Sequence, residues 1–469
     1  MSNTIPLRLD KLILNNFRCF KSCIVDFHPK LTVLVAENSQ GKSAILDAVG
    51  LALDVFVEKI ATEGAAQGFD RASIHINWIS DEEKKVPVLP TEFHAEGYVD
   101  SSAVTWSRKV IKYTLHPRSS TKDTATIRAA AGKLRSRVST FDPSLSDSPP
   151  VLPVVAFYRT NRLWGESRTV DGRKAKHPSG SERFAAYFDC LSSSSSFKSF
   201  ATWYERAFNE LRSPHSKARD RENRLEMQIT AVQEAVRIAL EPTGWTSITW
   251  EFPQTSTDGR LESVGCIVVE HSARGRFPLS LLSDGVKNMI ALVADLAYRC
   301  VRLNAHLEES AARLTPGVVM IDEVDMHLHP SWQQVVVELL QKAFPSIQFI
   351  LTTHSPQVLS TVDSESIRLI RLESGVATIS TPQFQTRGVE SADVLAEVMG
   401  TDPIPDVEPA RRLSQYMALI QQDLDETDSG RALRTELEEH FGAKHPLMRE
   451  CQRLVRLRTF KRQLPPRGS

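Results

Sequence analysis

The chain has 469 residues, and its 57 Lys and Arg are balanced by 57 Asp and Glu, so the formal net charge is zero. This length suits two or three domains, or one large domain with insertions. A neutral chain is not drawn to nucleic acid by bulk charge, so any such contact needs a local patch. The scattered cysteines, the lack of a signal-peptide pattern and the absence of a long apolar run predict a cytoplasmic protein without a membrane segment.

The first part of the chain predicts strands followed by a phosphate-binding loop. Residues 6–27 alternate as two antiparallel strands would, and residues 31–35 have the composition of a buried strand. A helix is expected over about 42–59. The segment between strand and helix, AENSQGKS, fits G-x-x-x-x-G-K-[ST] except that Ala36 replaces the first glycine.

This loop has the chemistry of a nucleotide phosphate site. Backbone N–H groups in such a turn, followed by a helix N-terminus, bind phosphate oxygens. Lys42 would contact the β- and γ-phosphates, and the Ser43 hydroxyl would bind Mg²⁺. The loop residues expected to surround the nucleotide are Ala36, Asn38, Ser39, Gly41, Lys42 and Ser43. A strand–turn–helix that contains GKS by chance is the less favoured alternative.

The middle of the chain predicts a hairpin, a helix, a strand and a mostly helical segment. In chain order these elements are the hairpin 92–107, the helix 121–138, the strand 152–158, the helical segment 181–240 and a strand–turn–strand unit over 247–270. The helical segment would turn back on itself as a short arm. Its charge run at 218–224 is either a solvated helix face or a nucleic-acid patch, and the solvated face is preferred.

Two later strands end in polar residues that would meet the phosphate loop. The apolar strand 316–321 is followed by Asp322 and Glu323, and the strand 346–351 is followed by His354. Parallel strands bring their carboxyl ends to the same edge of a sheet. Asp322 would then hold Mg²⁺, Glu323 would polarise a water in line with the γ-phosphate, and His354 would sense that phosphate. The alternative for each is an incidental polar residue at a strand end.

A helix N-terminus upstream of these strands is a second candidate anion site. Leu282–Asn288 precedes the helical run 289–301, and Ser283 or Asp284 could cap that helix. Its free N–H groups would then face outward. By itself this is only a helix cap, and its position before the Asp-Glu strand favours the functional interpretation, with Ser283 and Gly285 binding nucleotide.

Taken together, these residues resemble the ABC-type ATPases of the chromosome-maintenance and RecF-like group. Residues 36–43 are similar to the Walker A motif, and Asp322–Glu323 to a Walker B motif with its catalytic glutamate. Residues 282–285 are similar to the signature motif, and His354 to the switch histidine. The form D-E-x-[DE]-x-x-L-H-P, which begins at Asp322, resembles the OLD-like ATPases. Residues 386–395 and the helical tail resemble the ATPases of Septu and retron anti-phage systems.

The resemblance implies an α/β fold of the ABC-type P-loop class with an antiparallel β subdomain, a helical arm insertion and a helical C-terminal tail. The expected domains are an N-terminal ATPase lobe at 1–180, the arm at 181–245, a C-terminal ATPase lobe at 246–384 and a partner-binding region at 385–469. It also implies ATP hydrolysis with ATP and Mg²⁺, catalytic Glu323 and His354, and Mg²⁺ held by Ser43 and Asp322.

The same resemblance implies a homodimer or higher homo-oligomer that controls a separately encoded HNH nuclease, with nucleic acid as a further candidate partner. Two alternatives stay open: a self-sufficient OLD-like DNA nuclease, and a DNA-repair ATPase that clamps DNA. Asp423 and Asp425 are the tail carboxylates such a nuclease would use, although a solvated helix explains them better. The basic tail residues 449–462 predict a partner-docking helix or a DNA contact.

Overall fold

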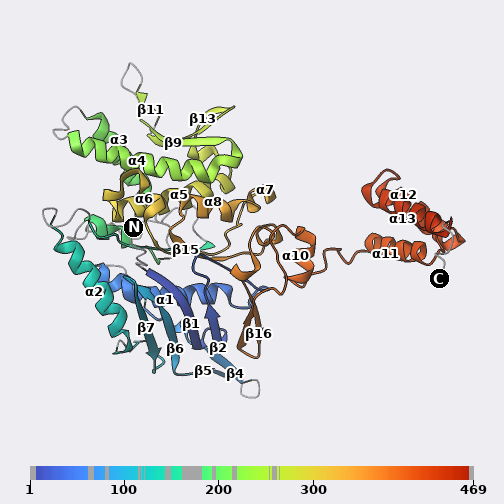
Figure 1. Ribbon diagram of the computed structural model, residues 1–469, viewed down its shortest axis with the longest axis horizontal. Coiled ribbons are helices and arrows are strands. Elements are labelled where there is room, and N and C mark those ends of the chain that lie inside the picture. Colours follow the sequence, from blue (N-terminus) through green and yellow to red (C-terminus); the bar gives the residue numbers. More distant parts are fainter. Residues whose placement is uncertain are drawn as a thin grey trace, which may run out of the picture. The chain divides into compact units, whose positions relative to one another are not determined.

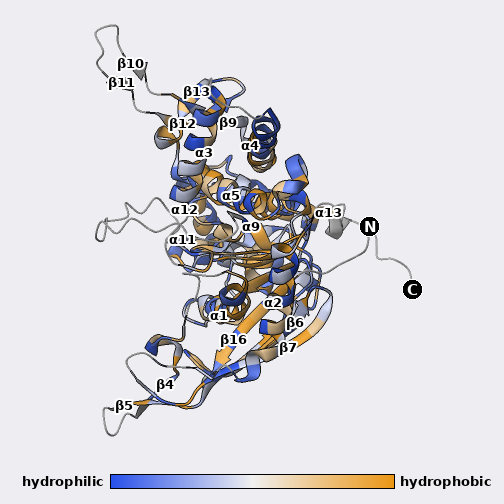
Figure 2. Ribbon diagram, turned by 90° about the vertical axis from the view of Figure 1, so that its left-hand side faces the viewer, coloured by the Kyte–Doolittle hydropathy of each residue, from blue (hydrophilic) through white to orange (hydrophobic). Residues whose placement is uncertain are grey.

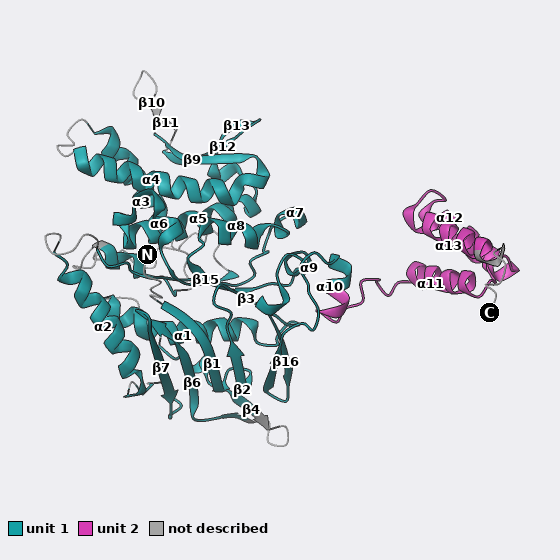
Figure 3. Cartoon of the chain, viewed as in Figure 1, with its two compact units in different colours: residues 1–394 teal, residues 395–469 magenta. Residues whose placement is uncertain are grey.

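A computed structural model describes residues 7–61, 68–79, 84–114, 117, 119–120, 122–142, 149–160, 182–192, 197–213, 219–252, 254–255, 261–263 and 265–463. The chain divides into two compact units, unit 1 (Met1–Val394) and unit 2 (Leu395–Ser469) (Figure 3). Among the described residues, no helix has the length and apolar character needed to cross a membrane.

The main sheet of unit 1 contains ten strands among the described residues, in the order β7-β6-β1-β2-β17-β16-β3-β15-β14-β8. Their bounds are β1 Leu7–Phe17, β2 Phe20–Asp26, β3 Leu31–Val35, β6 Thr91–Val99, β7 Ser102–Val110, β8 Val154–Tyr158, β14 Gly317–Ile321, β15 Ile347–Thr352, β16 Ile367–Glu373 and β17 Val376–Ser380. The hairpin β16–β17 joins the parallel strands on one side to the antiparallel strands on the other.

One half of this sheet is parallel and buried. Strands β3, β15, β14 and β8 pair in parallel, and every residue of β3, β14, β15 and β8 is buried. Helix α1 (Lys42–Ile60) lies on one side of these strands, and α5 (Asp284–Leu303) and α8 (Val336–Ala343) lie on the other (Figure 1). Figure 2 shows the hydrophobic residues concentrated in the strands. Helices on both faces explain why these strands are continuous apolar runs.

The other half is antiparallel, as the alternating sequence predicts. Strand β1 pairs with β2 and β6, and β6 pairs with β7, all antiparallel. Residues of β6 alternate between buried and more exposed positions, which gives the sheet one apolar face. Both predicted hairpins in this region are therefore confirmed, and the mixed α/β fold class is confirmed with them.

A buried glutamine joins the two halves of the sheet. Gln348 in β15 accepts a hydrogen bond from the Leu9 N–H at 3.0 Å, and its Nε2 donates to the Leu9 carbonyl at 2.7 Å. The same Nε2 donates to the His28 carbonyl at 3.1 Å. An apolar side chain at this place would leave these backbone groups buried without partners.

We expect Gln348→Met to destabilise unit 1 by at least about 3 kcal/mol, because three backbone groups lose their partner and each such group costs about 1–3 kcal/mol when buried. Urea unfolding followed by tryptophan fluorescence measures this change. Gln334→Met is the matched control, since Gln334 is exposed, and it should stay within about 0.5 kcal/mol of the parent. Equal stability of the Gln348 and Gln334 variants would contradict the inferred role of Gln348.

Above the parallel strands, further helices and a small sheet complete unit 1 (Figure 1). Helix α4 (Arg219–Leu240), in the segment expected to form an arm, contacts α5, α8 and the strand β9 (Trp245–Glu251). The remaining elements are α2 Ala125–Ser139, α3 Phe197–Arg212, α6 Ala311–Leu314, α7 Pro330–Gln333, α9 Pro356–Leu359, α10 Ser391–Glu397, β4 Ile76–Ile79, β5 Lys84–Pro87, β10 Gln254–Thr255, β11 Leu261–Ser263, β12 Cys266–His271 and β13 Gly275–Pro278.

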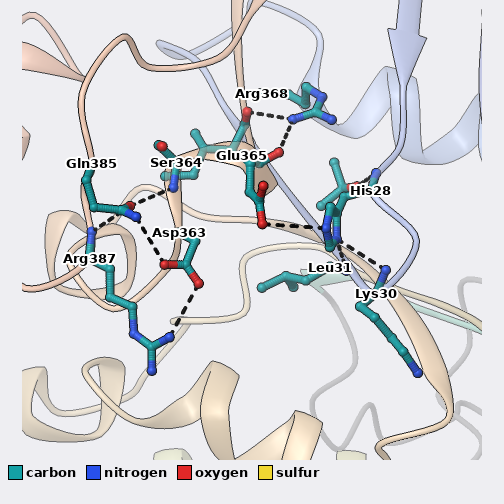
Figure 4. Close-up of polar contacts among 11 residues, drawn as sticks. His28, Lys30, Leu31, Asp363, Ser364, Glu365, Arg368, Gln385 and Arg387 are labelled. Carbon is teal, nitrogen blue, oxygen red and sulfur yellow. Dashed lines mark hydrogen bonds and ion pairs between the residues drawn. The ribbon is translucent and has the colours of Figure 1, made fainter.

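The segment that follows β17 is fastened to the turn after α9 (Figure 4). Gln385 accepts a hydrogen bond from the Ser364 N–H at 2.9 Å and donates to Asp363 at 3.3 Å. Arg387 forms an ion pair with the same carboxylate at 3.3 Å. The buried hydroxyl of Thr386 donates to the Val362 carbonyl at 2.6 Å. Residues 385–387 therefore hold this connection in place, and 386–387 belong to the segment that resembles Septu and retron ATPases.

Unit 2 has an apolar core of its own. Its helices are α11 (Glu408–Gln421), α12 (Asp428–Phe441) and α13 (Pro446–Gln463). The Thr427 hydroxyl caps α12 by accepting from the Gly430 N–H at 3.2 Å. The buried core residues come from all of these helices: Leu413, Tyr416, Ile420, Leu437, Met448 and Cys451. The predicted helical tail is confirmed.

Candidate nucleotide-binding site

The loop between β3 and α1 has a backbone that requires glycine at Gly41. This residue precedes α1 with φ of 96°, a conformation that residues with a side chain rarely adopt. A Cβ at Gly41 would also collide with the Phe20 ring and lie 2.8 Å from the Cys19 sulfur. Ser39 has φ of 65°, and Asn38 and Ser39 are both exposed. The turn thus combines left-handed residues with a helix N-terminus, a geometry that suits anion binding.

Lys42 lies inside this loop and is only 7% exposed. Its Nζ donates to the carbonyls of Ala36 at 2.8 Å and Glu37 at 3.2 Å. Burial lowers the pKa of Lys42, whereas the nearby carboxylates, Asp322 first, oppose this change. The ammonium is therefore held at the centre of the loop, where a phosphate group would receive its charge.

Ser43 and Asp322 are in direct contact, although they are far apart in the sequence. The Ser43 hydroxyl donates to Asp322 Oδ2 at 2.9 Å. Thr352 donates to Asp322 Oδ1 at 2.6 Å and accepts from the Glu323 N–H at 2.7 Å. Thr352 thus orients the carboxylate and the start of the following turn. The sequence does not indicate this role, because a threonine at a strand end is common.

The oxygen atoms of Ser43 and Asp322 suit Mg²⁺, which binds few protein oxygens and completes its shell with phosphate and water. Among the described residues, no group of three or more His, Cys, Asp or Glu is arranged to hold a metal without such outside ligands. These two residues fit a metal that arrives with nucleotide.

Glu323 and His354 lie at the same edge of the sheet. Glu323 follows β14 with φ of 49°, which turns the chain sharply at the end of the strand. His354 follows β15 and is partly buried. Burial, with a contribution from the positive charge of Lys42, lowers the pKa of His354, although the carboxylates of Glu323, Asp325 and Asp322 oppose this. The imidazole is therefore biased toward its neutral form, which can both accept and donate a hydrogen bond.

A buried carboxylate behind the loop was not predicted. Asp47 in α1 forms ion pairs with Arg18, from the turn after β1, and Arg159, which follows β8. Burial raises the pKa of Asp47, and the two guanidinium groups oppose that shift. This cluster joins three segments next to the phosphate loop, and no local sequence pattern could reveal contacts between residues so far apart.

The predicted signature residues lie at the N-terminus of α5. Ser283 is the N-cap residue, and in the described part of the chain no side chain caps this helix end. Gly285 lies so close to the backbone of residue 327 that a Cβ would be 2.5 Å from the His327 carbonyl oxygen. The N-terminus of α5 is therefore packed on the turn that follows Asp322 and Glu323.

We expect Gly285→Ala to displace either α5 or the turn at His327, because the added methyl group would collide with the His327 carbonyl unless one of the two backbones moves. Such overpacking typically costs about 1–3 kcal/mol. Thermal unfolding should report a lower Tm, and ATP turnover should fall with it. Gly68→Ala is the control, because its Cβ would meet nothing within 4 Å, and it should behave as the parent does. A normal Tm for Gly285→Ala would count against the close contact.

The structure therefore brings Lys42, Ser43, Asp322, Glu323 and His354 to one edge of the parallel strands. The Ala36 carbonyl accepts a hydrogen bond from Lys42, and Gly41 is the N-cap residue of α1. Gly285 contacts the turn at His327, and Ser283 is the N-cap residue of α5.

Comparisons with known proteins identify the family. The family described as "AAA domain, putative AbiEii toxin, Type IV TA system" matches residues 31–360, more than half of the chain. The chain is 25% identical to the retron Vc95 probable ATPase of Vibrio cholerae serotype O1 biovar El Tor, over 94% of this chain and 88% of the relative. It is 26% identical to the retron Ec83 probable ATPase of Escherichia coli, over 93% and 84%.

More distant similarities include Septu protein PtuA of Bacillus mycoides (strain KBAB4), which is 37% identical over 27% of this chain and 17% of the relative. Among solved structures, the SMC head bound to the C-winged helix domain of ScpA covers 80% of this chain and 97% of its own, with 17% identity and a TM-score of 0.45. The resemblance to retron and Septu ATPases is confirmed by the sequence matches. The chain belongs to the family described as "AAA domain, putative AbiEii toxin, Type IV TA system", and it is an ATPase.

Proposed function

We propose that this ATPase works as a dimer that closes around ATP and controls a separate nuclease in defence against phage. Two observations carry the proposal: Lys42, Ser43 and Asp322 lie together at one edge of the sheet, and the N-terminus of α5 at Ser283 has no side-chain cap. A helix N-terminus attracts negative charge. Each α5 would therefore bind the γ-phosphate held by the partner subunit, with Ser283 and Gly285 at the contact, so that ATP favours the closed pair.

Within this scheme each residue of one subunit has a distinct task. Lys42 neutralises the β- and γ-phosphates, and Ser43 and Asp322 hold Mg²⁺, which supplies positive charge to the phosphates. Glu323 accepts a proton from the attacking water, and His354 hydrogen-bonds the γ-phosphate in its neutral form. Loss of that phosphate removes the attraction for the α5 of the partner, so hydrolysis opens the pair.

The named relatives support a role in defence, because the similar proteins come from retron and Septu systems. In our proposal the nuclease is an HNH protein encoded beside this ATPase, and unit 2 holds it. Helix α13 carries six basic residues and one acidic residue, with Leu457 and Phe460 exposed among them. Such a helix suits an acidic, partly apolar protein surface.

Co-purification from the native locus tests the partner. We expect a tagged chain to retain the HNH protein, and the complex to cut DNA that the purified ATPase with Mg²⁺ leaves intact. Cutting by the ATPase alone would favour the alternative of a self-sufficient nuclease. Asp423→Ala and Asp425→Ala would then decide whether the tail carboxylates hold the metal, since cutting that survives both substitutions removes those residues from consideration.

A further inference from the structure

The turn at residues 324–328 connects the proposed base to the N-terminus of α5. It begins directly after Glu323, and its His327 carbonyl contacts Gly285. The turn is short and closed by its own backbone, since Met326 N–H donates to Glu323 O at 3.1 Å and Leu328 N–H donates to Asp325 O at 3.1 Å. His327 has a left-handed φ of 62°. A backbone held in this conformation needs support from outside the turn.

Gln333, at the end of α7, supplies such support. Its Nε2 donates to the Leu328 carbonyl at 3.0 Å and lies 3.5 Å from the Asp325 carbonyl. Its Oε1 accepts a hydrogen bond from the Ser355 hydroxyl at 2.8 Å. One amide group therefore bonds the 324–328 turn through its donor end and the residue after His354 through its acceptor end.

A second contact runs beside the first. The Thr353 hydroxyl donates to the Asp325 carboxylate at 2.5 Å. The Ser355 hydroxyl also caps α9, since it accepts a hydrogen bond from the Val358 N–H at 3.3 Å. The segment 353–355, which contains His354, is thus joined to the 324–328 turn on both sides of the histidine.

We propose that Gln333 is a positioning residue that transmits movement of His354 to the 324–328 turn, and from there to the N-terminus of α5. When His354 shifts with the state of the γ-phosphate, Ser355 shifts with it, and Gln333 carries the displacement to the Leu328 carbonyl. The His327 carbonyl then moves against Gly285, which has no side chain to absorb the change. The last step, at α5, rests on the proposed closure of two subunits, whereas the first steps occur within one chain.

The test compares amide hydrogen exchange of the full-length chain with and without ATP and Mg²⁺. In the parent, nucleotide should change the protection of peptides that cover 324–328. Gln333→Met, of similar length but without donor or acceptor, should keep ATP affinity within about twofold and lose at least about half of that nucleotide-dependent difference. A purely structural role would instead raise exchange equally with and without nucleotide.

Gln333→Glu separates the two ends of the amide. It keeps an acceptor for Ser355 but loses the donor to the Leu328 carbonyl, so we expect it to behave as Gln333→Met does. Gln334→Glu, at the exposed neighbouring position, is the control and should behave as the parent. A full nucleotide-dependent difference in Gln333→Met would overturn the inference.

Failure of the dimer proposal has a separate signature. If the Glu323→Gln protein stays monomeric with ATP, the proposed closure is wrong, yet the exchange difference at 324–328 still measures the coupling within one chain. If closure occurs but Gln333→Met preserves the exchange difference, the dimer proposal stands and the role of Gln333 falls.

Discussion

Glu323→Gln should bind ATP as the parent does, hydrolyse it about 10²- to 10⁴-fold more slowly, and accumulate as a dimer. The amide keeps the size of the side chain but cannot accept the proton of an attacking water, and a positioned base contributes rate enhancement of this order. The positive φ at residue 323 and the N–H bond to Thr352 do not depend on the side-chain charge, so the turn should be preserved. Phosphate release measures turnover, and light scattering after gel filtration with ATP and Mg²⁺ measures association.

A matched substitution separates the local role of this carboxylate from a general loss of charge. Glu338 is exposed on α8, so Glu338→Gln should hydrolyse ATP at the rate of the parent and should not accumulate as a dimer. Turnover by Glu323→Gln within a few fold of the parent would exclude Glu323 as the base. A monomeric protein that still retains ATP would exclude the proposed closure.

Lys42→Ala should lose most of its affinity for ATP. Removal of one member of a desolvated, hydrogen-bonded charge pair costs about 2–5 kcal/mol, which corresponds to about 30-fold or more in Kd. Because the loop carbonyls of Ala36 and Glu37 already hold the ammonium in place, little ordering is needed when nucleotide binds. Isothermal titration with a slowly hydrolysed ATP analogue measures the change.

The pH dependence gives a second measure of the same contact. Burial lowers the pKa of Lys42 from its usual value of 10.5, and only the protonated form attracts phosphate. Affinity should therefore fall as the pH rises through that lowered pKa, and this dependence should vanish in Lys42→Ala. Lys59→Ala, at the exposed end of the same helix, should retain both the affinity and its pH dependence. Equal affinities of the Lys42→Ala and Lys59→Ala proteins would refute the assignment.

The parallel strands could be predicted because their signal is local. Each of β3, β14 and β15 is a short, mostly apolar run, and the polar residues that matter come a few residues after its end. The rule that parallel strands end at one edge then brings Lys42, Asp322 and His354 together without any knowledge of the rest of the chain.

Contacts between distant segments could not be predicted in this way. The place of β16 and β17 between the two halves of the sheet depends on pairing partners that their own residues do not specify. The same holds for Asp47 with Arg18 and Arg159, and for the bonds of Gln333, because glutamine and arginine are common on surfaces. The roles of these side chains therefore follow from the tertiary contacts and not from the residues next to them in the sequence.

The separate core of unit 2 has an evolutionary consequence. A helical module with its own interior, from Leu413 to Cys451, can be exchanged between genes by recombination without redesign of the catalytic part. Under the proposed function, such an exchange would change the bound nuclease while the ATPase site stays the same.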